Sequence, residues 1–137
     1  TRPPAGPPGS FRLLFGRAPM HSFSRTHSNR LLSDMMSENT VWLNHTSASR
    51  LGLKSNDLVR LRNQDGIVSN RIKVKATERI RPDCVYMVHG FGHTSRGLRH
   101  AFGKGASDAK LVTRYQTDPL MGGTGMNVNF VTIEPEA

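Results

Sequence analysis

Cysteine is almost absent from this chain of 137 residues, in which Cys84 is the single example. One thiol cannot form an internal disulfide, nor supply the several cysteine ligands of a structural zinc site or an iron–sulfur cluster. Because Cys84 opens the apolar run Cys84–Val88, we expect it to be a small core residue. The six histidines show no paired spacing of a helical metal site. The sequence therefore predicts neither a metal-ligand set nor a catalytic residue in this chain.

Long apolar runs are also missing, since none approaches the roughly 20 residues that span a bilayer, and we expect no direct membrane insertion. Residues 1–10 have no apolar centre and do not resemble a signal peptide. They hold four prolines and two glycines, a composition typical of an extended linker. We therefore predict a linker over residues 1–10 and one domain over residues 11–137, cut from the C-terminal part of a larger protein.

Acidic residues are scarce: ten Asp and Glu face nineteen Lys and Arg, a formal net charge of +9. Fourteen of the cations are Arg, whose planar fork of donors suits phosphate and flat heterocycles. A GC-rich genome is the plain explanation of the Arg excess. The others are an anionic cofactor, nucleic acid or an acidic partner surface.

Alternating apolar residues predict a mainly β chain. The strands are expected around residues 11–15, 40–44, 59–62, 72–76, 84–88 and 128–133. Turns are expected at residues 63–66, where Gly66 can adopt positive φ, and at residues 81–83. Residues 134–137 are expected to be a frayed tail.

Three short helices are predicted between the strands. The first covers residues 30–36 with Ser28 or Asn29 as its N-cap. The second covers residues 46–51, with Ser47 able to cap it and Gly52 to end it. The third runs from Ser107 to about residue 115. Many short strands with few helices favour a closed barrel over a sandwich.

Three loops are rich in glycine and hydrogen-bond donors: residues 16–29, 89–97 and 118–127. The first contains two fixed positive charges, Arg17 and Arg25. In the third, Gly122, Gly123 and Gly125 can form a nest of N–H groups for an anion. Such loops on one small chain indicate one extended, polar, anionic ligand held by several loops.

Residues 41–87 show a strand, a small helix with Ala48, the triplet Leu51-Gly52-Leu53, then Gly66, and finally Arg81-Pro82. This order resembles the molybdopterin-dinucleotide-binding domain at the C-terminus of the dimethyl-sulfoxide-reductase family. The ending of the chain, with Asp118-Pro119, Asn127 and residues 131–133, is similar to that family's closing pattern. The resemblance covers about residues 11–133. It implies a six-stranded double-psi β-barrel, the fold of aspartate decarboxylase.

The resemblance also implies site residues. The first loop of the family wraps the pyranopterin, and the loop after the strand Cys84–Val88 approaches it. Asn127 stands where the family places an amide or Lys near the second pterin. The cofactor-binding residues implied are Gly16, Arg17, His21, Ser22, Arg25, Thr26, His93, Thr94 and Asn127.

The motifs FRLLFGRAPMHSFSRT and HGFGHT are most similar to the catalytic subunits of thiosulfate and polysulfide reductases. The resemblance then implies a domain that clamps bis-(molybdopterin guanine dinucleotide) with molybdenum from one side. Other domains of the parent chain would complete the site and hold an iron–sulfur cluster, and an electron-transfer iron–sulfur subunit would be a partner. A periplasmic parent is implied as well. The fragment alone is expected to have no turnover.

Two alternatives remain open. The charge of +9 would suit a nucleic-acid-binding β-barrel, although exposed aromatics for base stacking are few. A pyruvoyl enzyme of the aspartate-decarboxylase type would need self-cleavage at Gly-Ser. The one Gly-Ser pair, Gly9-Ser10, lies in the predicted linker, so an unbroken chain is expected.

Overall fold

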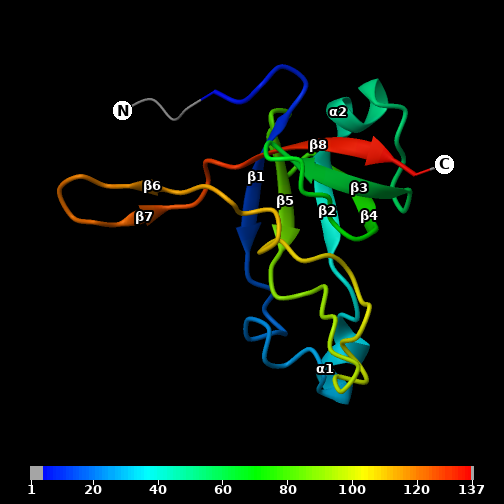
Figure 1. Cartoon of the computed structure of the whole chain (residues 1–137). Helices are drawn as coiled ribbons and strands as arrows, with labels where there is room; N and C mark the ends of the chain where they lie inside the picture. The colour runs from blue at the N-terminus through cyan, green and yellow to red at the C-terminus, as the bar shows by residue number, and fades with distance from the viewer. Residues whose placement is uncertain (1–4, 137) are drawn as a thin grey trace.

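The computed structural model describes residues 5–136, which form a closed six-stranded barrel (Figure 1). Its strands follow the order β1-β5-β2-β4-β3-β8, and β8 pairs with β1. The predicted double-psi barrel is confirmed. The barrel strands are β1 (Phe11–Gly16), β2 (Thr40–Asn44), β3 (Leu58–Asn63), β4 (Ile72–Thr77), β5 (Cys84–Val88) and β8 (Phe130–Pro135).

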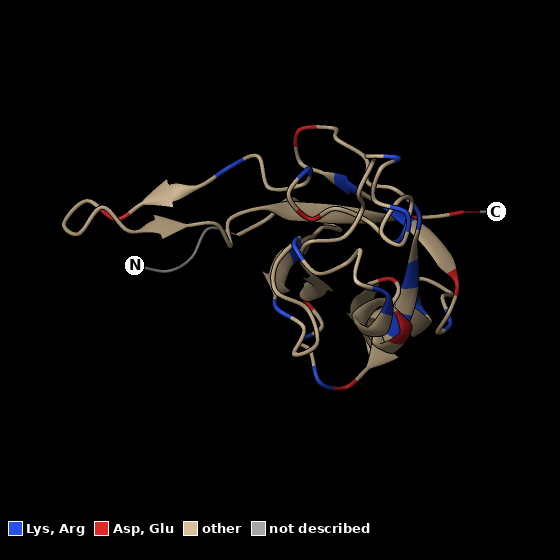
Figure 2. Cartoon of the chain, turned by 90° about the horizontal axis from the view of Figure 1, so that it is seen from below, with Lys and Arg blue, Asp and Glu red and all other residues tan. Residues whose placement is uncertain are grey.

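The other elements lie outside the barrel wall. Helix α1 (Arg30–Met35) lies beyond one end of the barrel, and α2 (His45–Arg50) packs beside the other. The strands β6 (Gln116–Thr117) and β7 (Thr124–Gly125) form a hairpin that projects away from the barrel (Figures 1 and 2).

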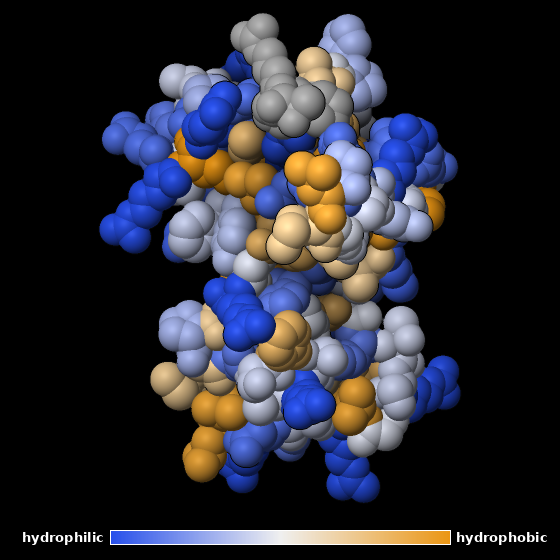
Figure 3. Space-filling model, turned by 90° about the vertical axis from the view of Figure 1, so that its left-hand side faces the viewer, coloured by the Kyte–Doolittle hydropathy of each residue, from blue (hydrophilic) through white to orange (hydrophobic). Residues whose placement is uncertain are grey.

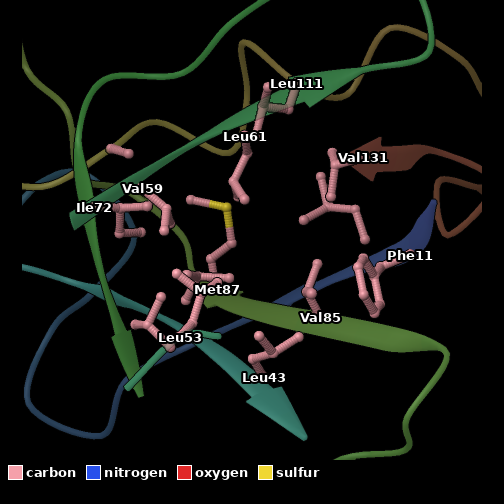
Figure 4. Close-up of a cluster of buried hydrophobic side chains, with 14 of the residues drawn as sticks. Phe11, Leu43, Leu53, Val59, Leu61, Ile72, Val85, Met87, Leu111 and Val131 are labelled. Atoms are coloured by element: carbon pink, nitrogen blue, oxygen red, sulfur yellow. The ribbon is translucent and has the colours of Figure 1, made fainter. Parts of the chain in front are cut away.

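Alternation along the strands fills the barrel interior. Val59 and Leu61 of β3 are fully buried, whereas Leu58 and Arg62 face solvent. The same alternation holds in β1 and β4, where Leu13 and Ile72 are buried. Met87 of β5 is fully buried among the core side chains (Figure 4). Apolar residues at every second position of a strand all point to the same side, and here that side faces the barrel interior.

The parallel pair β1–β5 positions the loops that follow these strands. Gly16, the last residue of β1, lies opposite Val88, the last residue of β5. The pairing continues into the loops, because the His89 N–H donates to the Gly16 carbonyl over 2.9 Å. Two donor-rich loops therefore leave the same end of the barrel side by side.

Two predicted helices are confirmed, with different caps. The Asn29 side chain accepts from the Leu32 N–H and caps α1, as predicted. Helix α2 begins one residue earlier than expected and is capped by Asn44, not Ser47. Ser47 is buried and its hydroxyl donates to the Pro82 carbonyl over 2.8 Å, so it serves packing.

The third predicted helix is wrong. The Leu111 and Val112 N–H groups both bond to the Asp108 carbonyl, which makes one turn. The chain then leaves the helical path because the buried Asn129 side chain accepts from Thr113 N–H at 3.1 Å and Arg114 N–H at 2.9 Å. A tertiary contact from the start of β8 therefore overrides the local propensity.

The predicted frayed tail is also wrong within the described part of the chain. Strand β8 extends to Pro135, and Glu134 pairs with Arg62 of β3. Glu136 accepts from Arg71 over 2.8 Å. At the other terminus, residues 5–10 contain no helix or strand, and residues 1–4 of the predicted linker lie outside the described residues.

Candidate functional site

The loops after β1 and β5 interlock because two glycines have no side chain. Gly90 has φ 93°, and a Cβ there would lie 2.3 Å from the Phe23 carbonyl oxygen. Gly92 has φ 78°, and its Cβ would lie 2.4 Å from the Ser107 nitrogen. Both positions require positive φ and a close approach of backbones. The loops of residues 17–29, 89–95 and 104–108 therefore form one body.

A cluster of histidine rings lies inside this body. The rings of His21 and His27 stack at a centroid distance of 4.2 Å, and Phe91 meets His27 edge-on at 4.1 Å. The ring centroid of His93 lies 5.5 Å from that of His27, and the ring centroid of His89 lies 5.0 Å from that of Phe23. His27 is only 3% exposed.

Several of these ring nitrogens are buried without a hydrogen-bond partner among the described residues. They are both nitrogens of His27 and the Nε2 atoms of His89 and His93. The pKa of His27 is lowered to about 4, chiefly by burial and also by the neighbouring His21 and His93, and a backbone contact with Ser24 opposes this shift in part. His27 is therefore neutral at physiological pH, and the nitrogens named above lack a protein partner within residues 5–136.

His21, Ser22 and Thr26 stabilise the shape of the first loop. The His21 Nε2–H donates to the Met36 carbonyl at 2.8 Å, which leaves Nδ1 to accept from the Thr26 hydroxyl at 3.1 Å. The Thr26 oxygen accepts in turn from the Ser22 N–H at 2.9 Å. Of these predicted contacts, His21 and Ser22 line a surface hollow and Thr26 braces them from within.

The two predicted cations of this loop have different surroundings. The Arg17 guanidinium lies 4.2 Å from the centre of the Phe23 ring, an arrangement that holds a cation over an aromatic face. Arg25 is exposed, and its backbone N–H bonds to the Ser22 carbonyl. Arg17 borders the same hollow as His21 and Ser22, whereas Arg25 does not.

Three hollows share lining residues with one another, and together they are called the groove. The first, of about 460 Å³, is bordered by Arg17 and reaches Phe23. The second, of about 470 Å³, extends from Phe23 past His89 and the predicted residues His93 and Thr94 to Asp108. The third, of about 530 Å³, shares His89 and Asp108 with the second and ends at the base of the hairpin, where it is lined by Phe15, Tyr115 and Met126.

The groove lies between the two halves of the molecule. Figure 3 shows a waist between the upper half, which carries the hairpin, and the lower half, which the loops form. The third hollow is lined by Met126, which follows β7 of the hairpin, and by His89, which follows β5. Neighbouring hollows of this kind match the extended ligand that the three loops predict.

Two predicted site residues lie elsewhere. Gly16 faces Tyr86, whose hydroxyl would lie 2.9 Å from a Cβ at this position, so its lack of a side chain serves packing. Asn127 is exposed and its carbonyl accepts from Arg12 near the opposite end of β1. Asn127 follows Met126, which borders the far end of the groove. It is therefore not brought together with His21 and His93.

The turn of the glycine-rich third loop is organised by Asp118. Its side chain accepts from the Leu120 and Met121 N–H groups, and its carbonyl accepts from the Gly122 N–H. The Gly122 N–H therefore already has a partner inside the hairpin turn. An anion site formed by the three glycines of this loop stays a prediction.

Sequence reasoning missed several groove residues. Phe23 and His89 line the groove, and His27 packs behind it against Phe91. All three lie in loops that were already singled out, and the number of histidines there was the available signal. Asp108 was assigned to a helix start. It is 6% exposed and borders two of the three hollows, which no local pattern indicates.

No group of three or more His, Cys, Asp or Glu within residues 5–136 is arranged to hold a metal ion. Over the same residues, no helix has the length and apolar character that crossing a membrane requires. Lys and Arg are spread over several loops and strands (Figure 2). On β4 and beside it, Arg71 pairs with Glu136, Lys73 with Glu38, and Lys75 lies 4.4 Å from the Trp42 ring centre.

Comparison with known proteins identifies one domain family. The family model described as "Molydopterin dinucleotide binding domain" matches residues 11–130. The thiosulfate reductase molybdopterin-containing subunit PhsA of Salmonella typhimurium is 30% identical over 78% of this chain and 14% of its own length. The putative dimethyl sulfoxide reductase chain YnfE of Escherichia coli is 32% identical over 88% of this chain and 15% of its own.

Two further relatives are more distant. The arsenate respiratory reductase molybdopterin-containing subunit ArrA of Chrysiogenes arsenatis is 27% identical over 75% of this chain and 12% of its own length. Acetylene hydratase from Pelobacter acetylenicus has the same fold, with a TM-score of 0.63 at 16% identity over 92% of this chain and 18% of its own. The chain thus spans less than a fifth of the length of each of these four proteins.

Proposed function

Because the chain belongs to the molybdopterin dinucleotide-binding domain family, we propose that its groove holds part of a bis-(molybdopterin guanine dinucleotide) cofactor. In this proposal the chain is one side of a clamp, and other domains of a larger parent complete it. The observation that carries the proposal is the set of three hollows with shared lining residues, which extends from Arg17 past His93 to Met126. Three such hollows suit an elongated ligand better than a compact substrate.

The chemistry of the groove fits this group. The buried, unpaired nitrogens of His89 and His93 lie in residues that line the central hollow, where they can bond to the polar edges of a pterin. Arg17 borders one end and suits the pyrophosphate, because a guanidinium binds phosphate oxygens through two N–H groups. When bound, the molybdenum of the cofactor supplies the redox chemistry. The residues of this chain bind and orient the ligand.

The nine residues that the sequence nominated contribute unequally to the proposed site. Arg17, His21, Ser22, His93 and Thr94 border the groove. Thr26 acts by holding the loop. Gly16, Arg25 and Asn127 have no groove contact of their own, so their assignment rests on the family resemblance alone.

For the parent, we propose an oxidoreductase that reduces thiosulfate or polysulfide. The similarity to a thiosulfate reductase subunit supports this substrate class, together with the loop motifs that carry the same resemblance. The proposal includes an iron–sulfur cluster in another domain of the parent and an electron-transfer iron–sulfur subunit as partner.

Equilibrium dialysis tests the binding proposal. Molybdopterin guanine dinucleotide, released from a molybdenum enzyme, is dialysed against this chain and quantified by pterin fluorescence. Arg17→Gln and His93→Ala are each expected to weaken binding about 10-fold, the value of one hydrogen bond to a charged or buried group. Arg79→Gln, which changes an exposed turn cation, is the control. Equal binding by all variants, or none by the original chain, would contradict the proposal.

A further inference from the structure

The groove contains one acidic side chain whose presence a purely anionic ligand does not explain. Asp108 is 6% exposed and borders both the central and the third hollow. Its Oδ1 atom accepts from the Gly90 N–H over a long 3.4 Å. Over residues 5–136, no Lys, Arg or His pairs with this carboxylate, and its Oδ2 atom has no protein donor.

Asp108 as a whole is nearly buried, but its Oδ2 atom is not among the fully buried atoms that lack a partner, so this oxygen is open to the hollow. A carboxylate oxygen without a counter-ion favours N–H donors and repels a phosphate. In a chain with a net charge of +9, we therefore expect the part of the ligand beside Asp108 to carry N–H donors.

We propose that Asp108 accepts the paired N–H donors of the 2-amino-pyrimidinone edge that guanine and pterin rings share. This inference rests on the proposed function, because it concerns the same groove and specifies which part of the dinucleotide lies at its middle. A ring N–H and the adjacent amino group present two parallel donors, which match the two oxygens of a carboxylate. The phosphates then lie toward Arg17, at the end of the groove that the carboxylate does not reach.

Small ligands show whether the guanine ring or the pterin ring supplies this edge. The 137-residue chain is titrated with GMP and, separately, with 6-hydroxymethylpterin, and amide signals are followed by ¹⁵N NMR up to millimolar ligand. We expect Gly90 and Ala109, the neighbours of Asp108, to shift. A response to GMP alone assigns the guanine half to this site, and a response to the pterin alone assigns the pterin half. If neither ligand shifts the amide signals of Gly90 and Ala109, the proposal is overturned.

IMP, which lacks the 2-amino group of GMP, tests the paired donors. Where GMP binds, IMP is expected to bind about 10-fold more weakly, since one hydrogen bond to a charged acceptor is lost. Where only the pterin binds, lumazine, which lacks the same amino group, takes this role. Equal affinity for GMP and IMP, or for the pterin and lumazine, would contradict the assignment.

Asp108→Asn tests the residue itself with little risk to the fold, because the amide oxygen can still accept from the Gly90 N–H. Its NH₂ group would oppose the ligand donors, so affinity should fall about 10-fold or more. Asp34→Asn makes the same charge change at an exposed site on α1 and should leave affinity unchanged. Equal loss in both variants would reduce the effect to net charge and overturn the role of Asp108.

The complete dinucleotide separates this inference from the broader proposal. If it binds the original chain and the Asp108→Asn variant equally, the role of Asp108 is wrong and the cofactor groove stands. If it binds neither, both proposals are wrong.

Discussion

His27 is buried in its neutral form, and this links the stability of the chain to acid. Its folded-state pKa of about 4 lies below the ordinary 6.5, so the unfolded chain takes up a proton first. Stability is therefore complete above about pH 6.5, falls as the pH drops toward 4, and levels off below the folded-state pKa. The loss attributable to His27 reaches about 3 kcal/mol.

Urea unfolding at pH 7.0, 5.5 and 4.0 measures this effect. His27→Phe keeps a ring in the stack and removes the titration, so its stability should fall less between pH 6.5 and 4 than that of the original chain. His100→Phe, at an exposed position, should retain the full acid dependence. Identical pH profiles for the original chain and His27→Phe would refute the assignment.

Gly92 provides a second residue-scale prediction, about the space between loops. Gly92→Ala adds a Cβ 2.4 Å from the Ser107 nitrogen, as well as the strain of φ 78°. We expect a loss of about 3 kcal/mol or more in the free energy of unfolding. Gly103→Ala has a similar φ of 69° with nothing within 4 Å, so it should lose only about 1 kcal/mol. Thermal unfolding of the pair isolates the clash, and equal losses would argue against it.

Single residues mark the limit of what this sequence predicts. That the loop with His93 takes part in a site follows from its glycines and donors, because these residue types indicate close backbone approach. The roles of His27 and Asp108 do not follow, since they depend on contacts between separate loops: the His27 to Phe91 ring contact spans 64 positions of sequence, and the Gly90 to Asp108 hydrogen bond spans 18. Nothing local distinguishes a buried histidine in a loop from an exposed one.

At the scale of elements, Asn129 organises the approach to the hairpin. Its side chain accepts from Thr113, Arg114 and Gln64 and donates to the Arg114 and Met126 carbonyls. It is fully buried, so all these groups lose a partner if it is removed. Asn129 thus joins the two strands of the hairpin at their base.

Asn129→Ala should lower the free energy of unfolding by about 3 kcal/mol, because five part-buried hydrogen bonds are lost together. Hydrogen exchange should accelerate at Thr113 and Arg114, while β2 and β5 in the barrel stay protected. Asn127→Ala, at an exposed neighbour, should change stability by less than about 0.5 kcal/mol. Unchanged exchange at Thr113 in Asn129→Ala would contradict this role.

The same residue shows why strands were easier to predict than helices. Val59 and Leu61 alternate with charged residues, and the barrel buries them as that pattern requires. Residues 107–115 have a helical cap and suitable propensity, yet form a single turn because Asn129 captures the backbone that follows. Local rules hold where one face is buried and fail where a distant side chain supplies the hydrogen bonds.

At the scale of the whole molecule, the formal charge of +9 overstates the cations that are free to bind a polyanion. Six ion pairs occupy six Lys and Arg side chains in the described residues. The Lys75 ammonium lies over the Trp42 ring. Lys and Arg residues are spread over several separate segments of the chain (Figure 2). A nucleic-acid-binding surface would instead gather them along one stripe, interleaved with exposed aromatics.

We therefore predict weak binding of single-stranded DNA with a shallow salt dependence. In filter-binding titrations, the slope of log K against log salt should be about −1 or smaller in magnitude, since each phosphate contact contributes about −0.7. Glu136→Gln would release Arg60 and Arg71 from their shared partner and should steepen the slope by about one. A steep slope in the original chain would restore the nucleic-acid hypothesis. The difference between the two chains decides whether ion pairing, rather than a lack of cations, keeps this basic domain from binding nucleic acid.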